Sequence, residues 1–441
     1  MNQTLNVSEN TRVEIRACRN RVTIIGWDDP QISCDQPVRQ DGNTIFVEGA
    51  TKVNLRVPRA MPITLDDCRA DVRAEDLTDE LVLTNIRGDI ALRNLRGETR
   101  IGDIDGSLVA RRVTSLKGNG TWDGDVALHD LQTLSASNID GDVVIRGANA
   151  VTLQDVEGSI VLERVECAQI NTIEGDAHLN DVGAVTLQHV KNDLSARQLG
   201  GALSVADVEG DVNVREAHAR VAIARVGGDF IVSDAHDALL TPEIEGDAVV
   251  SLSEVAETTV RADGDVVLNL PNETNAELRV DAPAGDIIVH ADLQNRDEGA
   301  NHLRGTLGRG GIALQIESRH GDVIVRSGSA AEHHYGHAHR QREEYREYAA
   351  AYRKMGQRLA EQVRASVRAS LADAGIQPHC HKRHWRIGIG IDDSETLQEE
   401  PLANKPRGPA SGSPERQAIL DAIARGELNV DDAIKKLRGE T

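Results

Sequence analysis

Through the middle of the chain, aliphatic residues alternate with polar residues in short runs, and these runs recur at a nearly constant interval. Residues 141–157 form one such unit, and its aliphatic side chains are Val143, Ile145, Val151, Leu153 and Val156. Alternation with a period of two is typical of short strands that bury one face. The pattern therefore predicts two or three short β-strands in each unit.

A glycine followed by a polar and then an aliphatic residue marks the start of each unit. These glycines are Gly88, Gly106, Gly124, Gly141, Gly158, Gly175, Gly210, Gly228, Gly246 and Gly264, and Asn192 takes the same place once. Their spacing is 17 or 18 residues, and a fixed period of this length indicates a solenoid. We therefore predict a mostly β fold, a single-stranded parallel β-helix with 17–18-residue coils.

Both ends of such a β-helix need a cap, because open strand edges pair with other chains. Residues 1–65 contain strands of irregular spacing, and we predict that they form an N-terminal β cap. The β-helix itself is expected over residues 66–330. A longer excursion at residues 291–311 interrupts the repeat, and residues 312–325 are expected to resume it as the last coil.

After the repeats, the apolar period changes to that of a helix. Over residues 338–374, the apolar side chains are Tyr345, Tyr348, Tyr352, Met355, Leu359, Val363, Val367 and Leu371. Spacings of three and four predict an amphipathic helix, which we expect to cap the C-terminal end. Three alternatives stay open for this basic helix: docking on the solenoid, a coiled coil, or contact with an anionic membrane.

Charge divides the chain into two parts. The net charge is −22 overall, yet residues 331–390 carry 11 Lys and Arg against 6 Asp and Glu. The acidic solenoid is not expected to bind nucleic acid and would attract cationic proteins, although acidity also keeps a long body soluble. Opposite charges within one chain favour docking of the 338–374 helix on the solenoid.

Two sequence features could hold a metal. The Gly-Asp turns are explained locally, because glycine reaches positive φ and aspartate accepts backbone hydrogen bonds, but stacked carboxylates could also bind calcium. Histidines cluster in residues 333–339 and 379–384, where zinc could bind. Neither cluster has regular ligand spacing, so we predict no metal and no cofactor.

The chain's cysteines and its N-terminal residues bear on its compartment. Cys18, Cys34, Cys68, Cys167 and Cys380 are scattered, with no CxxC pair, which favours a reducing environment over a disulfide framework. We find no run of about 18 apolar residues and no signal-peptide pattern at the start. The expected location is cytoplasmic.

The C-terminal residues predict a small helical hairpin. Residues 375–413 read as a linker by composition, and residues 414–439 as two short helices. Their apolar side chains are the candidate protein-interaction residues Ile419, Leu420, Ile423, Leu428, Ile434 and Leu437. Because this pair has too little core to stand alone, we expect it to bind a protein partner or another copy of itself.

Two resemblances extend this interpretation. The strand at residues 22–28, the Gly-Asp rungs and the final stretch of residues 316–325 resemble the bacterial putative-adhesin family of β-strand-repeat proteins, a domain of unknown function. Residues 419–437 are similar to short helical hairpins that mediate oligomerisation. A comparable hairpin accompanies the same β-domain, usually at the N-terminus, in cell-envelope stress-response proteins of Gram-positive bacteria. The resemblances imply fold and association, and carry over no catalytic residue.

These observations favour a non-enzymatic scaffold or adaptor over an enzyme. A polymer-forming, bactofilin-like cytoskeletal β-helix is the first alternative, although filaments need open ends, and a surface adhesin is the second. An 18-residue coil also occurs in hexapeptide-repeat acyltransferases, but the six-residue step from Val143 lands on Asn149 and Asp155. The excursion at residues 291–311 offers charged side chains without a recognisable catalytic arrangement.

Overall fold

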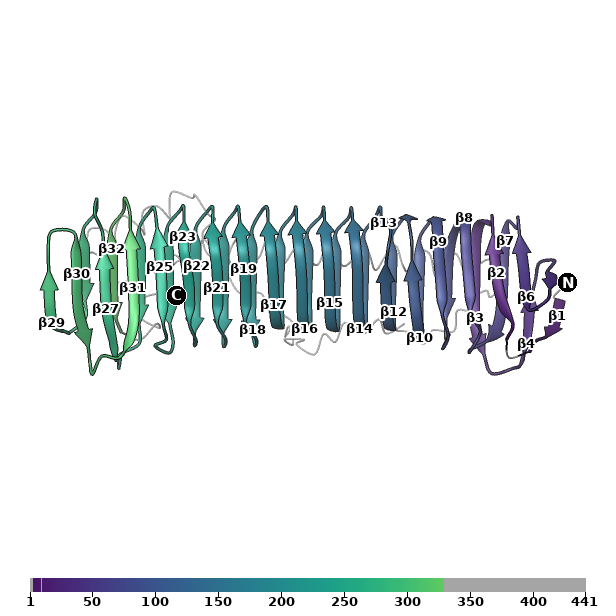
Figure 1. Ribbon diagram of the computed structural model, residues 1–441, viewed down its shortest axis with the longest axis horizontal. Coiled ribbons are helices and arrows are strands. Elements are labelled where there is room, and N and C mark those ends of the chain that lie inside the picture. The colour runs from purple at the N-terminus through teal and green to yellow at the C-terminus, as the bar shows by residue number, and fades with distance from the viewer. Residues whose placement is uncertain (1–2, 9, 329–441) are drawn as a thin grey trace, which may run out of the picture. The chain divides into compact units, whose positions relative to one another are not determined.

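The described part of the protein is built from β-strands and turns. In the computed structural model, residues 3–8 and 10–328 are described (Figure 1). The strands at the N-terminal end are β1 (Gln3–Asn6), β2 (Arg12–Arg16), β3 (Arg19–Trp27), β4 (Gln31–Cys34), β5 (Arg39–Asp41), β6 (Thr44–Glu48) and β7 (Lys52–Pro58). No helix within the described residues is long and apolar enough to cross a membrane.

The central coils follow one another in chain order. Their strands are β8 (Ile63–Glu75), β9 (Leu81–Arg87), β10 (Ile90–Ile101), β11 (Ile104–Asp105), β12 (Leu108–Gly118), β13 (Thr121–Trp122), β14 (Val126–Ile139), β15 (Val143–Val156), β16 (Ile160–Ile173), β17 (Ala177–Val190), β18 (Leu194–Leu199), β19 (Leu203–Val208), β20 (Val212–Ala217), β21 (Val221–Val226), β22 (Phe230–Ala235), β23 (Leu239–Ile244), β24 (Ala248–Leu252), β25 (Thr258–Ala262) and β26 (Val266–Leu270). The C-terminal end contains β27 (Ala276–Asp281), β28 (Ile287–His290), β29 (Leu293–Glu298), β30 (His302–Leu307), β31 (Ile312–Ser318) and β32 (Val323–Ser327).

Each coil contributes to two parallel ladders. The first ladder runs through β18, β20, β22, β24 and β26. The second ladder runs through β19, β21, β23 and β25. Between β14 and β17, one long strand per coil serves both ladders, with in-register pairs such as Val143 with Ile160 and Val151 with Ala168. The prediction of a parallel β-solenoid with 17–18-residue coils is confirmed. We call the outer surfaces of the two ladders the first face and the second face.

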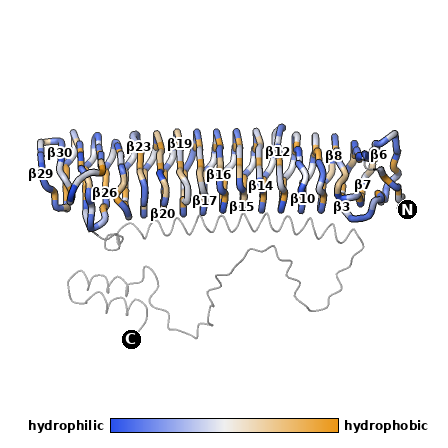
Figure 2. The backbone as a smooth tube through the Cα atoms, turned by 60° about the horizontal axis from the view of Figure 1, so that its bottom comes forward, coloured by the Kyte–Doolittle hydropathy of each residue, from blue (hydrophilic) through white to orange (hydrophobic). Residues whose placement is uncertain are grey.

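The core is the column of side chains that point between the two ladders. In each half of a coil the buried positions follow the same spacing, as in Val143, Ile145 and Ala148 and again in Val151, Leu153 and Val156. Hydrophilic and hydrophobic positions alternate along every turn of the tube (Figure 2). Stacking identical positions joins these side chains into one continuous aliphatic core.

A bend separates the two halves of a coil, and one residue there adopts a left-handed backbone. The positions are Asn94 (φ 55°), Arg112 (φ 56°), Asp130 (φ 57°), Gly147 (φ 76°), Arg164 (φ 54°), Asp181 (φ 53°), Gln198 (φ 54°), Glu216 (φ 55°) and Asp234 (φ 58°). Glycine, Asn and Asp tolerate this region best. Polar residues recur at the bend because the coil turns a corner there once per repeat.

At both ends the coils stack in a different order from their order in the chain. β3 lies between β7 and β8, because it pairs in parallel with both. Likewise β31 lies between β25 and β27, and β32 between β26 and β28. The prediction that residues 312–325 form the last coil is therefore wrong. Through residues 291–311, the chain passes from the outer strands β27 and β28 back to β31 and β32, which lie between those strands and the central coils.

Antiparallel strands cover most of the outer edges. At the N-terminal end β4 pairs with β7, β1 with β4, and β5 with β6; at the other end β30 pairs with β27, and β29 with β30. These strands close edges that would otherwise be open to further pairing. β8 spans Ile63–Glu75 and so runs across the boundary expected at residues 65 and 66. The predicted 338–374 helix, the linker and the hairpin lie outside the described residues.

Candidate functional site

The corner that contains the Gly-Asp turns carries a column of aspartates. Ser107 and Ser159 take this place in two coils. Where an aspartate is present, its carboxylate accepts a hydrogen bond from the backbone N–H of the same position in the next coil. The Asp247 N–H lies 2.9 Å from Oδ1 of Asp229, and the Asp265 N–H lies 2.8 Å from Oδ1 of Asp247. The aspartates therefore accept hydrogen bonds from the next coil. A hydrogen bond within the aspartate's own turn would have been the simpler arrangement.

Glycine precedes these aspartates because the stacked turns approach too closely for a side chain. A Cβ added to Gly141 would lie 2.5 Å from the carbonyl oxygen of Gly124. No such contact occurs in real structures without a shift of the backbone, so the turn positions are restricted to glycine or a close substitute. The repeated glycine signal is thus a packing requirement.

A second acidic column lies beside the first, at the residue that precedes most of the turn glycines, and Arg87, Lys191 and Gly227 interrupt it. It consists of Asp105, Asp123, Asp140, Glu157, Glu174, Glu209, Glu245 and Asp263. Burial raises the pKa of Asp193 in the turn column, and Asp211 and Asp176 add to the effect. Local desolvation, followed by repulsion from Asp140 and Asp105, raises the pKa of Asp123. This corner can attract cationic groups, although the turn aspartates already accept hydrogen bonds from backbone N–H groups.

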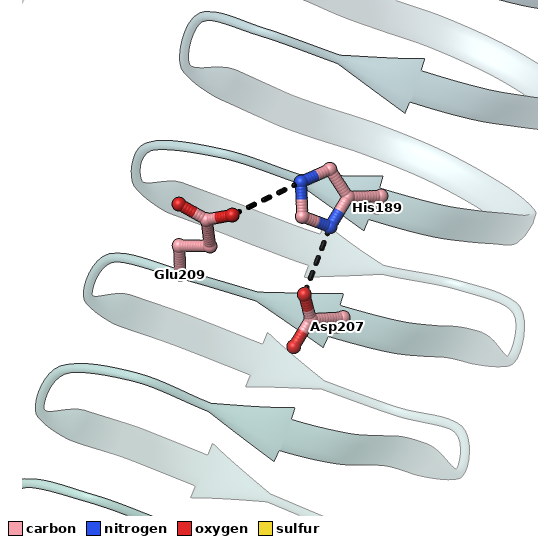
Figure 3. Close-up of side chains that lie close together, drawn as sticks. All are labelled: His189, Asp207 and Glu209. Carbon is pink, nitrogen blue, oxygen red and sulfur yellow. Dashed lines mark hydrogen bonds and ion pairs between the residues drawn. The ribbon is translucent and has the colours of Figure 1, made fainter.

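The described residues contain one group of three His, Cys, Asp or Glu side chains with ligand atoms close enough for a metal. It consists of His189, Asp207 and Glu209, whose ligand atoms lie within 4.8 Å of one another. The Nδ1 atom of His189 lies 2.8 Å from Oδ2 of Asp207, and its Nε2 atom lies 3.4 Å from Oε1 of Glu209 (Figure 3). The in-register pairing of β17 with β19 brings His189 beside Asp207.

The orientation of this histidine does not suit a metal. Its two ring nitrogens face two different carboxylates, so the three ligand atoms do not surround one point (Figure 3). Carboxylates only accept hydrogen bonds, so both contacts are made together when the ring carries a proton on each nitrogen. Arg225 binds the other oxygen of Asp207, with its Nη1 atom 3.1 Å from Oδ1, and also pairs with Glu245. The group is a network of ion pairs that links successive coils.

The same geometry argues against acid–base chemistry at this group. A catalytic histidine oriented by an aspartate needs its second nitrogen next to a nucleophile. In this protein the second nitrogen of His189 faces Glu209. Sequence reasoning missed the group, although the 18-residue interval between positions 189 and 207 equals the repeat and could have revealed the pair.

A shallow groove lies near the N-terminal end of the solenoid, on the bend side of the coils. It has a volume of about 760 Å³, and the side chains that line it include Asp28, Arg59, Asp76, Arg96, Arg112 and Asp130. Arg59 already pairs with Asp28, at 2.7 Å between Nε and Oδ1. Its polar lining of mixed charge differs from the mostly apolar pockets that bind small molecules.

The first face carries an outward aliphatic column, which we call the aliphatic stripe. Read in register from the N-terminal side, it consists of Ala91, Val109, Ala127, Val144, Val161, His178, Ser195, Asn213, Ile231, Val249, Val267, Ile324 and Ile288. Val249 and Ile288 are 36% and 40% exposed, and they are the large hydrophobic side chains most open to solvent among the described residues. Ten of these outward positions are thus aliphatic on a surface where polar residues are the norm.

Over the N-terminal coils, a column rich in basic residues, which we call the basic column, runs beside this stripe, two residues further along each strand; toward the C-terminal end the same position holds Ser233, Ser251 and Asn269. In register it reads Arg93, Arg111, His129, Arg146, Glu163, Asn180, Arg197 and Arg215. The Nε atom of Arg146 lies 3.0 Å from Glu163 Oε2, and an Nη2 of Arg197 lies 3.4 Å from Glu216. The first face therefore combines an apolar strip with a charged margin on each side, as docking surfaces do.

The candidate interaction residues predicted from the sequence, Ile419, Leu420, Ile423, Leu428, Ile434 and Leu437, lie outside the described residues, as do both histidine clusters. The aliphatic stripe was not predicted. Its signal is nevertheless present in the sequence, at the second position after each turn aspartate. Reading one such position across all repeats, rather than along one repeat, would have found it.

Taken together, these features define a two-faced parallel β-solenoid with antiparallel strands at its ends. The profile of the Toastrack DUF4097 family matches residues 4–326, and the chain belongs to this family. No curated protein matches the chain. Among solved structures, the chain is similar to a putative cell adhesion protein from Clostridium sporogenes ATCC 15579, with 9% identity over 74% of this chain and 99% of that chain, and a TM-score of 0.13.

Proposed function

We propose that this protein is a non-enzymatic scaffold that presents its solenoid as an interaction surface and associates through its C-terminal hairpin. The observation that carries the proposal is the repetition of outward residues in register along both faces. A partner with its own repeat, or several copies of one partner, would meet the same chemistry at each coil spacing of about 4.8 Å. The hairpin over residues 414–439 would then set how many solenoids are held together.

The state of the charged groups supports a binding role over a catalytic one. In the described group of His189, Asp207 and Glu209, both ring nitrogens of the histidine face carboxylates. The groove near the N-terminal end has Arg59 held by Asp28 rather than left to act on a substrate. A role in the cell-envelope stress response is part of the same proposal, and it rests on the resemblance of the hairpin alone.

The antiparallel end strands favour discrete particles over a bactofilin-like filament. β4 covers β7 at one end, and β30 covers β27 at the other. End-to-end growth would have to displace these strands or pair past them. A surface adhesin remains the second alternative, because it needs the same repeated faces.

Light scattering on the full-length protein tests the proposal. We expect an oligomeric mass for the wild type and a monomeric mass for the double variant Leu420→Asp with Ile423→Asp, because a charged side chain cannot be buried in the hairpin contact. The matched control is Gln417→Asp, which adds a charge outside the apolar positions and should leave the mass unchanged. Filaments under the electron microscope would contradict the proposal. A monomeric wild type would contradict self-association through the hairpin.

A further inference from the structure

The outward residues of the first face have the chemistry of a surface that receives a helix. Its aliphatic stripe runs at right angles to the strands, with the aspartate column on one side and the basic column on the other. Valine at an outward strand position can be explained by strand propensity alone. That explanation is weak here, because the second face fills most of the corresponding positions with polar or basic residues, such as Ser135, Thr152 and Gln169.

The chain itself supplies a segment that matches the stripe. Residues 338–374 have apolar side chains spaced by three and four, from Tyr345 to Leu371. A helix over this range would be about 55 Å long at about 1.5 Å per residue. The stripe from Ala91 to Ile288 crosses consecutive coils at about 4.8 Å each, which gives about 58 Å. Segment and stripe therefore have the same length.

The place where the chain leaves the described structure fits the same occupant. The last described strand is β32 (Val323–Ser327), and its Ile324 is itself a member of the stripe. The segment begins about ten residues after that strand, which at about 3.3 Å per residue is ample to turn onto the face. A partner from another molecule would have to compete with a segment already tethered at this site.

The charge of the aspartate margin favours this docking, whereas the basic column on the other margin opposes it. The segment carries Arg346, Arg353, Lys354, Arg358, Arg364 and Arg368 among others, and is net positive. The stripe is bordered by the turn aspartates, which line up in register beside it from Asp89 to Asp265. Arginine and lysine have long side chains that can cover apolar surface while their charges reach such a margin.

We propose that the aliphatic stripe of the first face is the docking site of the chain's own residues 338–374, bound as an amphipathic helix along the solenoid. The tyrosines would lie over the C-terminal coils, where the stripe holds isoleucine and valine, and the leucine and valine residues over the smaller side chains toward Ala91. Docking covers the apolar face and the aspartate margin beside it, and leaves the polar second face for other partners. This goes beyond the scaffold proposal, which presents the solenoid faces and associates through residues 414–439, because docking would leave the second face as the one open to partners.

Hydrogen exchange on the full-length protein tests the docking. We expect slow exchange of residues 338–374 in the wild type, and exchange at least about tenfold faster in the double variant Val144→Lys with Val161→Lys, because both lysines place charge in the contact. The matched control is Thr152→Lys with Gln169→Lys, at the corresponding register on the second face. In the control, residues 338–374 should exchange as slowly as in the wild type.

A photo-crosslink identifies the occupant. In a background of Cys167→Ser and Cys380→Ser, Val249→Cys is labelled with a benzophenone maleimide, and Thr259→Cys serves as the control on the second face. We expect cross-links from position 249 to peptides of residues 338–374 of the same chain, and none of these from position 259. An equal mixture of light and isotopically heavy protein distinguishes copies.

Two results would overturn the proposal. One is exchange of residues 338–374 at the rate of an unstructured peptide in the wild type. The other is cross-links from position 249 that join light to heavy chains, which would assign the stripe to a second copy. Neither depends on the hairpin, so the docking and the scaffold proposals can fail separately.

Discussion

The two faces of the solenoid share one inward pattern and differ in their outward residues. Along the first face, the outward column beside the turn is mostly alanine, valine and isoleucine. In the equivalent column of the second face the residues are Val82, Arg100, Lys117, Ser135, Thr152, Gln169, Thr186, Ser204, Ala222, Leu240 and Thr259. Folding thus requires only the inward residues to be apolar, and the outward residues are free to serve binding.

The sharpest test of this comparison truncates inward and outward side chains at the same level. Ile145 and Leu153 point inward from the two ladders, with exposed fractions of 0% and 2%. Each change to alanine should cost about 2 to 5 kcal/mol, since it leaves a cavity that stacked coils cannot fill. Urea unfolding followed by circular dichroism measures both.

The outward neighbours are the controls for that experiment. Val144→Ala on the first face and Thr152→Ala on the second should each cost less than about 1 kcal/mol, because no core contact is lost. Equal losses at Ile145 and Val144 would mean that the first face is part of the core, and the distinction between the faces would fail.

The repeat explains why the fold could be predicted from the sequence. The turn glycine is imposed by the contact of one backbone with the next, as at Gly141 and Gly124, so its period reports the coil directly. The inward aliphatic residues follow from the same stacking. Each of these constraints acts between adjacent coils, and every coil repeats them, so the signal accumulates along the chain.

The order of the terminal coils could not be predicted in this way. Residues 312–327 have the same alternation as any other coil, yet they lie inside residues 276–290. Which of two similar coils is outermost depends on pairings across residues 291–311 and not on local pattern. The network of His189, Asp207 and Glu209 was missed for a related reason, since it depends on side-chain orientation as well as register.

Acid should affect the first face through two of its histidines, His129 and His178. Burial lowers the pKa of His129, with Arg146 and Arg111 adding to the effect against Asp130 and Glu163. Burial also lowers the pKa of His178, against the opposing influence of Asp176 and Asp193. A lowered pKa means that the unfolded chain takes up these protons first, so stability falls as the pH drops below about 6.5.

Replacing both histidines isolates this effect. We expect the double variant His129→Gln with His178→Gln to lose less stability than the wild type between pH 7.5 and pH 5.5, as measured by the urea midpoint at each pH. The comparison variant is His290→Gln, whose side chain lies at the exposed end of the first ladder. If the double variant and the wild type fall by the same amount, other groups cause the acid response.

The smallest effect is expected from the ion pairs of the second face. The side chains of His189 and Asp207 are 32% and 26% exposed, and pairs of this kind contribute only about 0.2 to 1 kcal/mol because solvent screens them. A double-mutant cycle with His189→Gln and Asp207→Asn should give a coupling within that range, and the coupling should shrink when sodium chloride is raised from 0.1 M to 1 M.

Added zinc should leave the urea midpoint of the wild type unchanged, because the two ring nitrogens of His189 face separate carboxylates (Figure 3). A rise of the midpoint with zinc that is abolished by His189→Gln would show instead that the ring turns to bind a metal, and the second face would then carry a site that its ion pairs conceal.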